Sequence, residues 1–292
     1  MAERRFDDAF LRKLEYLSIV ARRVFGGTLR AERRSKQVGA GVAFADHRAY
    51  VAGDDLRYVD WAVYARLERL LLRLFHEEED LHVYLLVDAS ASMGGSGKLD
   101  HATRIAAALA YVALANLDRV SLIPLGVGAS PGLPPKRGRG TILPILRFLE
   151  QLEARGETDL AAGVEAFVRR APRPGLAILV SDFYDADGYA AALDRLRFRR
   201  HETTAIHVWS AAEAEPDLLG DVELVDVESQ VTREITVDER LLAGYHAAHR
   251  ELTDGVARHC ATHGVTYVRA DVAVPFDDTV LHLFRRAGLV LG

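Results

Sequence analysis

Short apolar runs alternate with amphipathic segments over most of the chain after residue 80. The apolar runs have the length and the Val, Leu and Ile content of strands buried on both faces, and they lie at 83–88, 119–126, 176–182, 203–209 and 265–269. The segments between them have helical periodicity, at 98–116, 141–153, 158–170, 188–199, 238–263 and 279–287. This alternation predicts an α/β fold: a doubly wound, mostly parallel sheet with helices on both faces.

Three stretches depart from the alternation. Residues 221–237 are rich in strand-forming residues and predict a β insertion, whereas residues 130–140 are rich in Pro and Gly and predict a loop. Phe6, Phe10, Leu14 and Leu17 predict an amphipathic helix that ends at the glycine pair 26–27. We therefore expect an N-terminal helical arm and extension over residues 1–80 and the α/β domain over residues 81–292.

Composition narrows the class of protein. A chain of 292 residues with 49% hydrophobic residues and a net charge of −5 has the profile of a globular protein, without a general attraction to nucleic acid or anionic lipid. The N-terminus lacks the apolar core of a signal peptide, and no apolar run is long enough to span a bilayer. A single cysteine, Cys260, excludes an internal disulfide and is expected to be a packing residue. We expect a cytoplasmic protein without a membrane span or a nucleic-acid partner, and a solvated surface at the basic segment 28–36.

Candidate chemistry lies at the end of the first strand of the α/β domain. The strand 83–88 ends in Asp88, and Ser90 and Ser92 follow at alternate positions. Ligands of open α/β sheets bind at the carboxyl ends of strands, and Mg²⁺ prefers oxygen ligands. The alternative is that Ser90 or Ser92 only caps the following helix and that Thr158 caps its own helix.

The Asp-x-Ser-x-Ser motif resembles the metal-ion-dependent adhesion site of von Willebrand factor A domains, which have a Rossmann-type fold. That family completes the site with a Thr from a second loop and an Asp from a third, and Thr158 and Asp182 stand at matching places. The resemblance implies direct metal contacts from Ser90, Ser92 and Thr158, and contacts through water from Asp88 and Asp182. The third motif is usually Asp-Gly, but here Phe183 follows Asp182, which is expected to affect the loop more than the ligand.

The segment before the first site strand carries a second resemblance. It contains Arg48-x-Tyr-x-x-Gly-Asp-Asp55, then Val59-Asp-Trp61 and Tyr64-Ala-Arg66, and it resembles the bacterial family called domain of unknown function 58. From the residues alone, Asp54 and Asp55 belong to a turn, either with ion pairs to Arg48 and Arg57 or with a role in partner contact. Trp61 is expected to be a packing anchor.

Two classes of function fit these residues. In a binding module, neutral hydroxyl ligands leave the cation with net positive charge, which attracts an acidic side chain of a partner. The resemblance implies a non-enzymatic adaptor that uses Mg²⁺, or Mn²⁺ or Ca²⁺, and a MoxR-type AAA+ ATPase with its client as partners. The alternative is a metal-dependent phosphoester hydrolase that uses Asp88 and Asp182, but such an enzyme needs a base or second cation nearby, and Lys98 is expected on the surface.

Histidines offer a weaker candidate for metal binding. Four of them lie on the segment 238–263 at spacings that place each pair on one helix face: His246, His249, His259 and His263. We interpret them as a polar helix face rather than as a zinc site.

Overall fold

Contacts divide the chain into two units. The computed structural model describes residues 5–25, 34–38, 43–78, 81–126, 131–171, 173–185 and 188–288. One unit comprises Met1–Ala21 with Leu81–Gly292, and the other comprises Arg22–Asp80. Residues 8–21 of the first helix thus group with the α/β unit and its last four residues with the other unit, whereas the expected domain boundary placed the whole helix with the extension.

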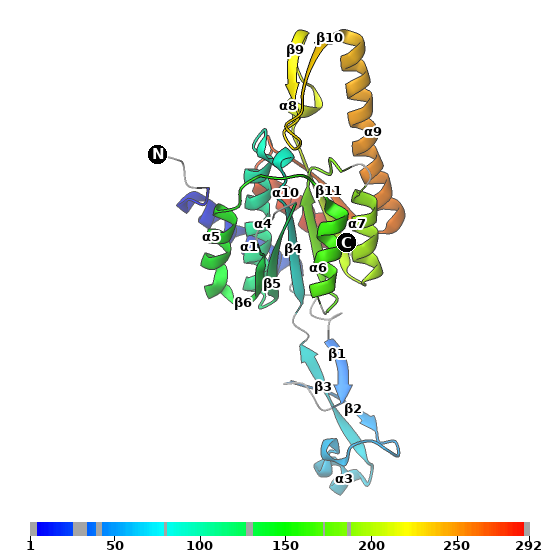
Figure 1. Cartoon of the computed structure of the whole chain (residues 1–292). Helices are drawn as coiled ribbons and strands as arrows, with labels where there is room; N and C mark the ends of the chain where they lie inside the picture. Colours follow the sequence, from blue (N-terminus) through cyan, green and yellow to red (C-terminus); the bar gives the residue numbers. More distant parts are fainter. Residues whose placement is uncertain are drawn as a thin grey trace. The chain divides into compact units, whose positions relative to one another are not determined.

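A six-stranded sheet forms the centre of the larger unit (Figure 1). Its strand order is β11-β8-β7-β4-β5-β6, and all pairs are parallel except β5 with β6. The predicted mostly parallel sheet is therefore confirmed. The strands are β4 (His82–Asp88), β5 (Arg119–Leu125), β6 (Leu133–Arg137), β7 (Leu176–Ser181), β8 (Glu202–Trp209) and β11 (Thr266–Asp271).

The chain changes direction across the sheet between β4 and β7. From β4 it adds β5 and β6 on one side, and it then returns to add β7, β8 and β11 on the other. Such a switch point leaves a crevice at the carboxyl ends of the two central strands, where ligands of doubly wound folds bind. β4 and β7 end at Asp88 and Ser181, so the sequence motifs lie at this point.

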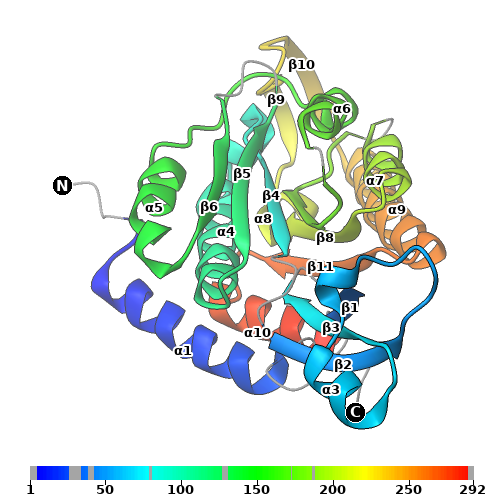
Figure 2. The same cartoon turned by 90° about the horizontal axis from the view of Figure 1, so that it is seen from below.

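Helices cover both faces of the sheet (Figure 2). Tyr84 and Leu86 of β4 belong to a core with α6 (Leu160–Arg170), α7 (Tyr189–Phe198) and α9 (Glu239–His263). Leu85 and Val87 point to the other face because side chains alternate along a strand, and α4 (Lys98–Ala115) packs there. Six of the seven residues of β4 are buried, as a central strand requires. Cys260 is buried in the first of these cores, as expected.

Two terminal helices complete the second face. α1 (Asp8–Phe25) ends where the glycine pair predicts, and α10 (Phe276–Gly288) packs against α4. The rings of Phe10 and Phe276 lie 4.8 Å apart, and Lys13 forms an ion pair with Asp277 at 2.7 Å. α5 (Ile142–Glu150) follows the short η3 (Arg139–Thr141) and also contacts α4. Within the described residues no helix combines the length and apolar character that a bilayer crossing requires.

The edge strand β6 lies inside the stretch that was expected to be only a loop. It pairs antiparallel with β5, through Leu122 with Leu133 and Val120 with Lys136, and the register shifts between these pairs. Pro134 and Pro135 cannot donate ladder hydrogen bonds, and an edge strand tolerates this because only one of its sides is paired. The loop prediction for this part was therefore wrong.

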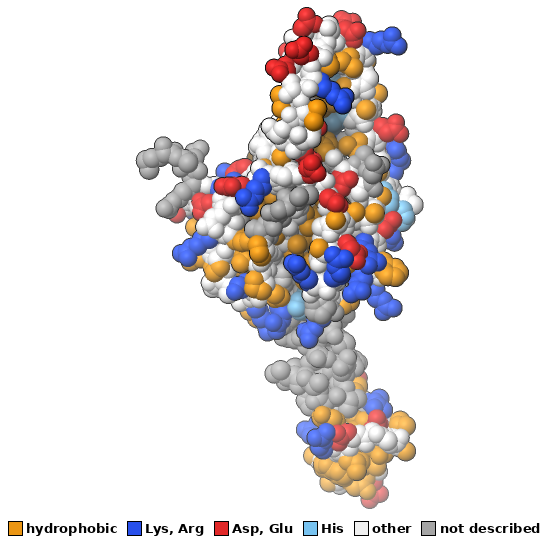
Figure 3. All heavy atoms as spheres, in the orientation of Figure 1, with side chains coloured by type: hydrophobic (Ala, Val, Ile, Leu, Met, Phe, Trp, Pro, Cys, Tyr) orange, Lys and Arg blue, Asp and Glu red, His pale blue; other side chains and the backbone are white. Residues whose placement is uncertain are grey.

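The predicted β insertion is a two-stranded antiparallel hairpin of β9 (Gly220–Val225) and β10 (Thr232–Val237), preceded by the short α8 (Ala211–Ala214). The hairpin is drawn in yellow to orange in Figure 1 and lies at the end of the sheet where β4 ends. Hydrophobic side chains reach the surface in this region (Figure 3), and those exposed by more than 40% are Leu224, Val225, Val227 and Val231.

The smaller unit has an antiparallel sheet of order β1-β3-β2. The ion pairs that were one of the two alternatives for the turn are present, between Arg48 and Asp54 at 2.9 Å and between Arg57 and Asp55 at 2.6 Å. Of the basic segment 28–36, residues 28–33 lie outside the described residues. The elements are β1 (Arg34–Val38), β2 (Ala43–Ala49), η1 (Leu56–Tyr58), α3 (Trp61–Leu67) and β3 (Leu71–Glu78).

Trp61 is not a packing anchor, so that prediction was wrong. It is the first residue of α3, where the Asp60 side chain caps the helix by accepting from the N–H groups of Ala62 and Val63. This position turns the indole outward: Trp61 is 55% exposed, and its described ring contact is edge-on with Tyr64 at 6.1 Å.

Gly175 precedes β7 at a point where two strands approach closely. A Cβ atom there would lie 2.2 Å from the carbonyl oxygen of His82, which is backbone and cannot move aside cheaply. We expect Gly175→Ala to lower the free energy of unfolding by about 1 to 3 kcal/mol in urea denaturation. Gly244→Ala is the matched control, because a Cβ in that part of α9 meets nothing within 4 Å and alanine should raise stability by about 0.5 to 1 kcal/mol. Equal effects of the two substitutions would contradict this account.

Candidate metal centre

Asp88 is the centre of a buried hydrogen-bond cluster. It is fully buried, and its Oδ1 atom accepts from the Ser90 backbone N–H at 3.0 Å and from the Ser90 hydroxyl at 2.7 Å. Its Oδ2 atom accepts from the hydroxyl of Ser181, the last residue of β7, at 2.6 Å. The parallel register brings these groups together, because Val87 pairs with Val180 and the next residues are therefore neighbours.

Burial and a second carboxylate set the protonation of Asp88. Loss of solvation raises its pKa most, and the negative charge of Asp182 raises it further. Hydrogen bonds from Ser181 and Ser90 oppose the rise, and the resulting pKa is about 6. Asp88 is therefore an anion at pH 7 that lacks full compensation for its burial, so a nearby cation would stabilise it.

The two serines form one oxygen pair. Ser92 lies in the short helix η2 (Ala91–Gly94), and its hydroxyl oxygen is 3.0 Å from that of Ser90. Ser90 stands at the start of η2 without a side-chain cap bond, and the residue that precedes α4 is Gly97. The helix-cap alternative therefore does not describe Ser90, and its hydroxyl serves Asp88.

The Thr158 loop lies against the loop that carries the serines. The Ala91 N–H donates to the carbonyl of Gly156 at 2.9 Å, and the Arg155 N–H donates to the carbonyl of Ala89 at 2.9 Å. The residue that caps α6 is Asp159, whose side chain accepts from Ala162. Thr158 is thus free of the capping role, and both its backbone N–H and its hydroxyl donate to a carboxylate that the sequence did not indicate, Glu228 of the β9–β10 turn.

Asp182 is paired with a buried lysine. Its Oδ2 atom accepts from Lys98 Nζ at 2.7 Å, and its Oδ1 atom accepts from the Tyr184 N–H at 3.1 Å. Lys98 also contacts Glu213 at 2.6 Å and lies 4.6 Å from the centre of the Tyr184 ring. The prediction that Lys98 lies on the surface was wrong: its side chain is 1% exposed. It begins α4 beside the carboxyl edge of the sheet, so its long side chain reaches the strand ends.

Phe183 adopts the backbone conformation that suits glycine. Its φ is +57°, in the left-handed region where a bulky residue is strained, and its ring is fully buried against His207 at 5.4 Å. The departure from Asp-Gly thus preserves the turn, since burial of the aromatic ring offsets the strain.

The predicted ligands are placed by three loops at the switch point. Asp88, Ser90 and Ser92 are directly connected, Asp182 is close enough to Asp88 to raise its pKa, and Thr158 is joined through backbone contacts between the loops. All five donors are oxygen atoms, the donor set that a hard cation such as Mg²⁺ requires. The residues therefore fit a Mg²⁺ ion in chemistry, with Lys98 as a competing cation at Asp182.

Some of the helix histidines come together elsewhere. Nitrogen atoms of His259 and His263 on α9 lie near a carboxylate oxygen of Asp194 on α7, all within 4.8 Å. Asp194 is half exposed and also contacts Arg197 at 3.6 Å. His249 belongs instead to the surroundings of Lys98, where its Nε2 lies 3.1 Å from the Tyr184 hydroxyl.

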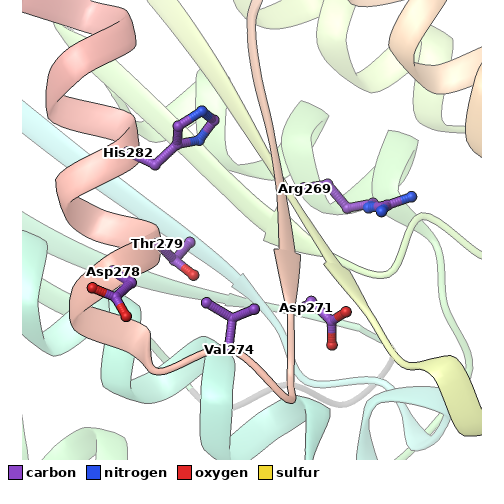
Figure 4. Close-up of a pocket in the computed structure, with 6 residues that line it drawn as sticks. All are labelled: Arg269, Asp271, Val274, Asp278, Thr279 and His282. Atoms are coloured by element: carbon purple, nitrogen blue, oxygen red, sulfur yellow. The ribbon is translucent and has the colours of Figure 1, made fainter.

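A hollow of about 270 Å³ lies between the end of β11 and the start of α10 (Figure 4). It is separate from the Asp88 cluster, because none of the five predicted ligands lines it. Its lining residues are Arg269, Asp271, Val274, Asp278, Thr279 and His282.

Comparison with known proteins gives relatives in mycobacteria. An uncharacterised protein of Mycobacterium tuberculosis and one of Mycobacterium bovis are each 32% identical over 257 residues, which cover 85% of this chain and 81% of theirs. Among solved structures, the conserved hypothetical protein BatB from Bacteroides thetaiotaomicron is 17% identical with a TM-score of 0.46, over 71% of this chain and 97% of that one. The model of the family described as "Protein of unknown function DUF58" matches residues 46–254, and the chain belongs to this family.

Proposed function

We propose that the protein is a magnesium-dependent protein-binding adaptor. The observation that carries the proposal is the buried cluster of Asp88 with serine hydroxyls at the switch point of the sheet. Ser90, Ser92 and Thr158 would hold Mg²⁺ directly, and Asp88 and Asp182 would hold it through water, as the resemblance to von Willebrand factor A domains implies. The bound cation would supply a positively charged position that accepts a carboxylate.

The charges at the site favour an acidic partner group only when the cation is present. Asp88, Asp182, Glu213 and Glu228 contribute four negative charges, and Lys98 contributes one positive charge that Asp182 and Glu213 share. Without Mg²⁺ the site is therefore negative and repels a carboxylate, whereas the two positive charges of Mg²⁺ would reduce this repulsion and offer the carboxylate a ligand position. Partner binding should accordingly depend on the divalent cation, with Mn²⁺ or Ca²⁺ as possible substitutes.

The hydrolase alternative needs a cation or base that faces the substrate. Lys98 was expected on the surface, but it is buried beside Asp182, where a second cation could lie close to the proposed metal. However, the Lys98 ammonium is buried between Asp182, Glu213 and the Tyr184 ring, so it does not face a substrate. The geometry therefore supports the binding module better.

Capture of a MoxR-type AAA+ ATPase tests the adaptor role. We expect the immobilised protein to retain the purified ATPase in Mg²⁺, and to lose at least tenfold in affinity in EDTA or with Asp88→Asn. Asp254→Asn, an exposed position on α9, is the control for loss of one negative charge. Capture that is equal in Mg²⁺, in EDTA and with Asp88→Asn would contradict the metal-bridge mechanism. Hydrolysis of p-nitrophenyl phosphate that requires Mg²⁺ and Asp88 would favour the enzyme instead.

A further inference from the structure

Hydroxyl ligands of a cation need an acceptor for their own proton. When the O–H group donates to a carboxylate, the lone pairs of the oxygen remain available to the metal, and such outer partners orient the ligands. Ser90 has this arrangement, because its hydroxyl donates to Asp88 at 2.7 Å. Thr158 needs a corresponding acceptor for its hydroxyl proton.

Glu228 is the acceptor for the Thr158 hydroxyl. Its Oε2 atom accepts from the Thr158 backbone N–H at 2.9 Å, and its Oε1 atom accepts from the Thr158 hydroxyl. Two contacts from one carboxylate fix the side-chain rotamer of Thr158 and the direction of its O–H bond. Glu228 is partly buried, whereas the residues on either side of it in the turn, Val227 and Ser229, are exposed.

The turn that carries Glu228 is held in a defined shape. Asp226 accepts from the backbone N–H groups of Glu228 at 2.9 Å and Ser229 at 3.0 Å. The Gln230 N–H donates to the Asp226 carbonyl at 2.8 Å, and the Asp226 N–H donates to the Val231 carbonyl at 2.9 Å. The turn therefore presents Glu228 from a preorganised backbone, which lowers the entropy cost of its contact with Thr158.

We propose that Glu228 is a positioning residue of the metal site, which holds the Thr158 hydroxyl as a ligand and ties the β9–β10 hairpin to the site. The inference rests on the proposed function, since it assigns Glu228 a role toward the same cation. It adds a fourth segment, remote in sequence, to the three loops of the motif. The same hairpin carries exposed apolar side chains, Val227 and Val231 among them.

Magnesium titration of the full chain by calorimetry tests this role with three variants. Glu228→Gln removes the charge and one acceptor, and Glu228→Asp keeps the charge but is too short to bridge both Thr158 donors. We expect each to weaken Mg²⁺ binding by about 10- to 100-fold, the range for outer partners of metal ligands. Glu223→Gln, an exposed position of β9 with the same charge change, should stay within about twofold of wild type.

The outcomes separate this inference from the function on which it rests. If wild type and Glu223→Gln bind Mg²⁺ and both Glu228 variants bind it equally well, the positioning role is wrong and the metal site stands. If Glu228→Gln weakens binding but Glu228→Asp does not, charge alone acts and the positioning role is again wrong. Tighter binding by Glu228→Gln would make Glu228 a competitor for the cation, which also overturns it. If wild type itself does not bind Mg²⁺, the proposed function is wrong, and the role of Glu228 at a metal site is wrong with it. Urea unfolding in EDTA verifies that each variant is folded.

Discussion

Replacement of Lys98 by methionine is expected to lower the free energy of unfolding by about 3 to 5 kcal/mol in EDTA at pH 7. Methionine fills similar space but leaves Asp182 and Glu213 without their cation, and Asp182 is fully buried. Mg²⁺ should then stabilise the variant more than it stabilises wild type, because the divalent ion supplies the missing positive charge. Urea denaturation in EDTA and in Mg²⁺ measures both effects.

Lys13→Met is the matched control for the loss of a lysine. Lys13 forms an ion pair with Asp277 on the surface, where its side chain is 46% exposed. Exposed pairs contribute about 1 kcal/mol or less, so this variant should remain close to wild type and respond to Mg²⁺ as wild type does. A Lys98→Met protein as stable as Lys13→Met, or one whose response to Mg²⁺ is unchanged, would show that the buried ion pair has no part in the site.

Asp88→Asn is expected to have the opposite effect, a protein that is more stable than wild type without metal. Asparagine resembles the protonated acid, and a rise of the Asp88 pKa from 3.8 to about 6 corresponds to a cost on the order of 2 to 3 kcal/mol for the buried anion at pH 7. The same variant should not be stabilised by Mg²⁺. Greater stability together with loss of metal binding is the result expected when a strained group is kept for function.

The pH dependence has a defined sign. Because the folded protein binds the Asp88 proton more tightly than the unfolded chain does, this group makes wild type more stable as the pH falls from about 6 toward 4. Asp88→Asn lacks this gain, so its advantage over wild type should be largest above pH 6 and should shrink toward pH 4. Urea denaturation of both proteins at half-unit steps measures the difference. An advantage that is constant with pH, or that grows on acidification, would contradict the assignment.

The order of strands and helices can be predicted from the sequence because each kind of element has its own pattern of hydrophobic residues. β4, β5, β7 and β8 are apolar on both faces, and the segments between them have helical periodicity, so their bounds agree with the predicted ranges to within a few residues. β6 was not predicted because two adjacent prolines usually indicate a loop. An edge strand can contain them because only one of its sides forms ladder hydrogen bonds. The position of α1 on the larger unit depends on tertiary contacts such as Phe10 with Phe276, which no local pattern contains.

The residues of the candidate site also fall into two groups: those that the sequence indicates and those that only the fold brings to the site. Asp88, Ser90 and Asp182 stand at strand ends, where topology alone brings them together. The local sequence did not indicate that Lys98 is buried, because a lysine at the start of a helix is usually solvated. Only the arrangement of α4 over the sheet edge buries it. Glu228 lies 70 residues from Thr158 on an acidic hairpin, so its contact depends on the way the insertion folds back. Once the strand order is known, both residues can be sought among the charged residues that lie close to the sheet edge.

Thermal unfolding with excess EDTA or with Mg²⁺, for wild type and Asp88→Asn, tests most directly whether the cluster binds a cation. At a Mg²⁺ concentration tenfold above the dissociation constant, wild type should gain about 1.4 kcal/mol and its midpoint should rise by about 2 to 5 °C. The Asp88→Asn midpoint should not rise, and NaCl at matched ionic strength should not reproduce the effect. A midpoint of wild type that stays unchanged up to tens of millimolar Mg²⁺, or an equal rise in both proteins, would contradict a magnesium site at Asp88.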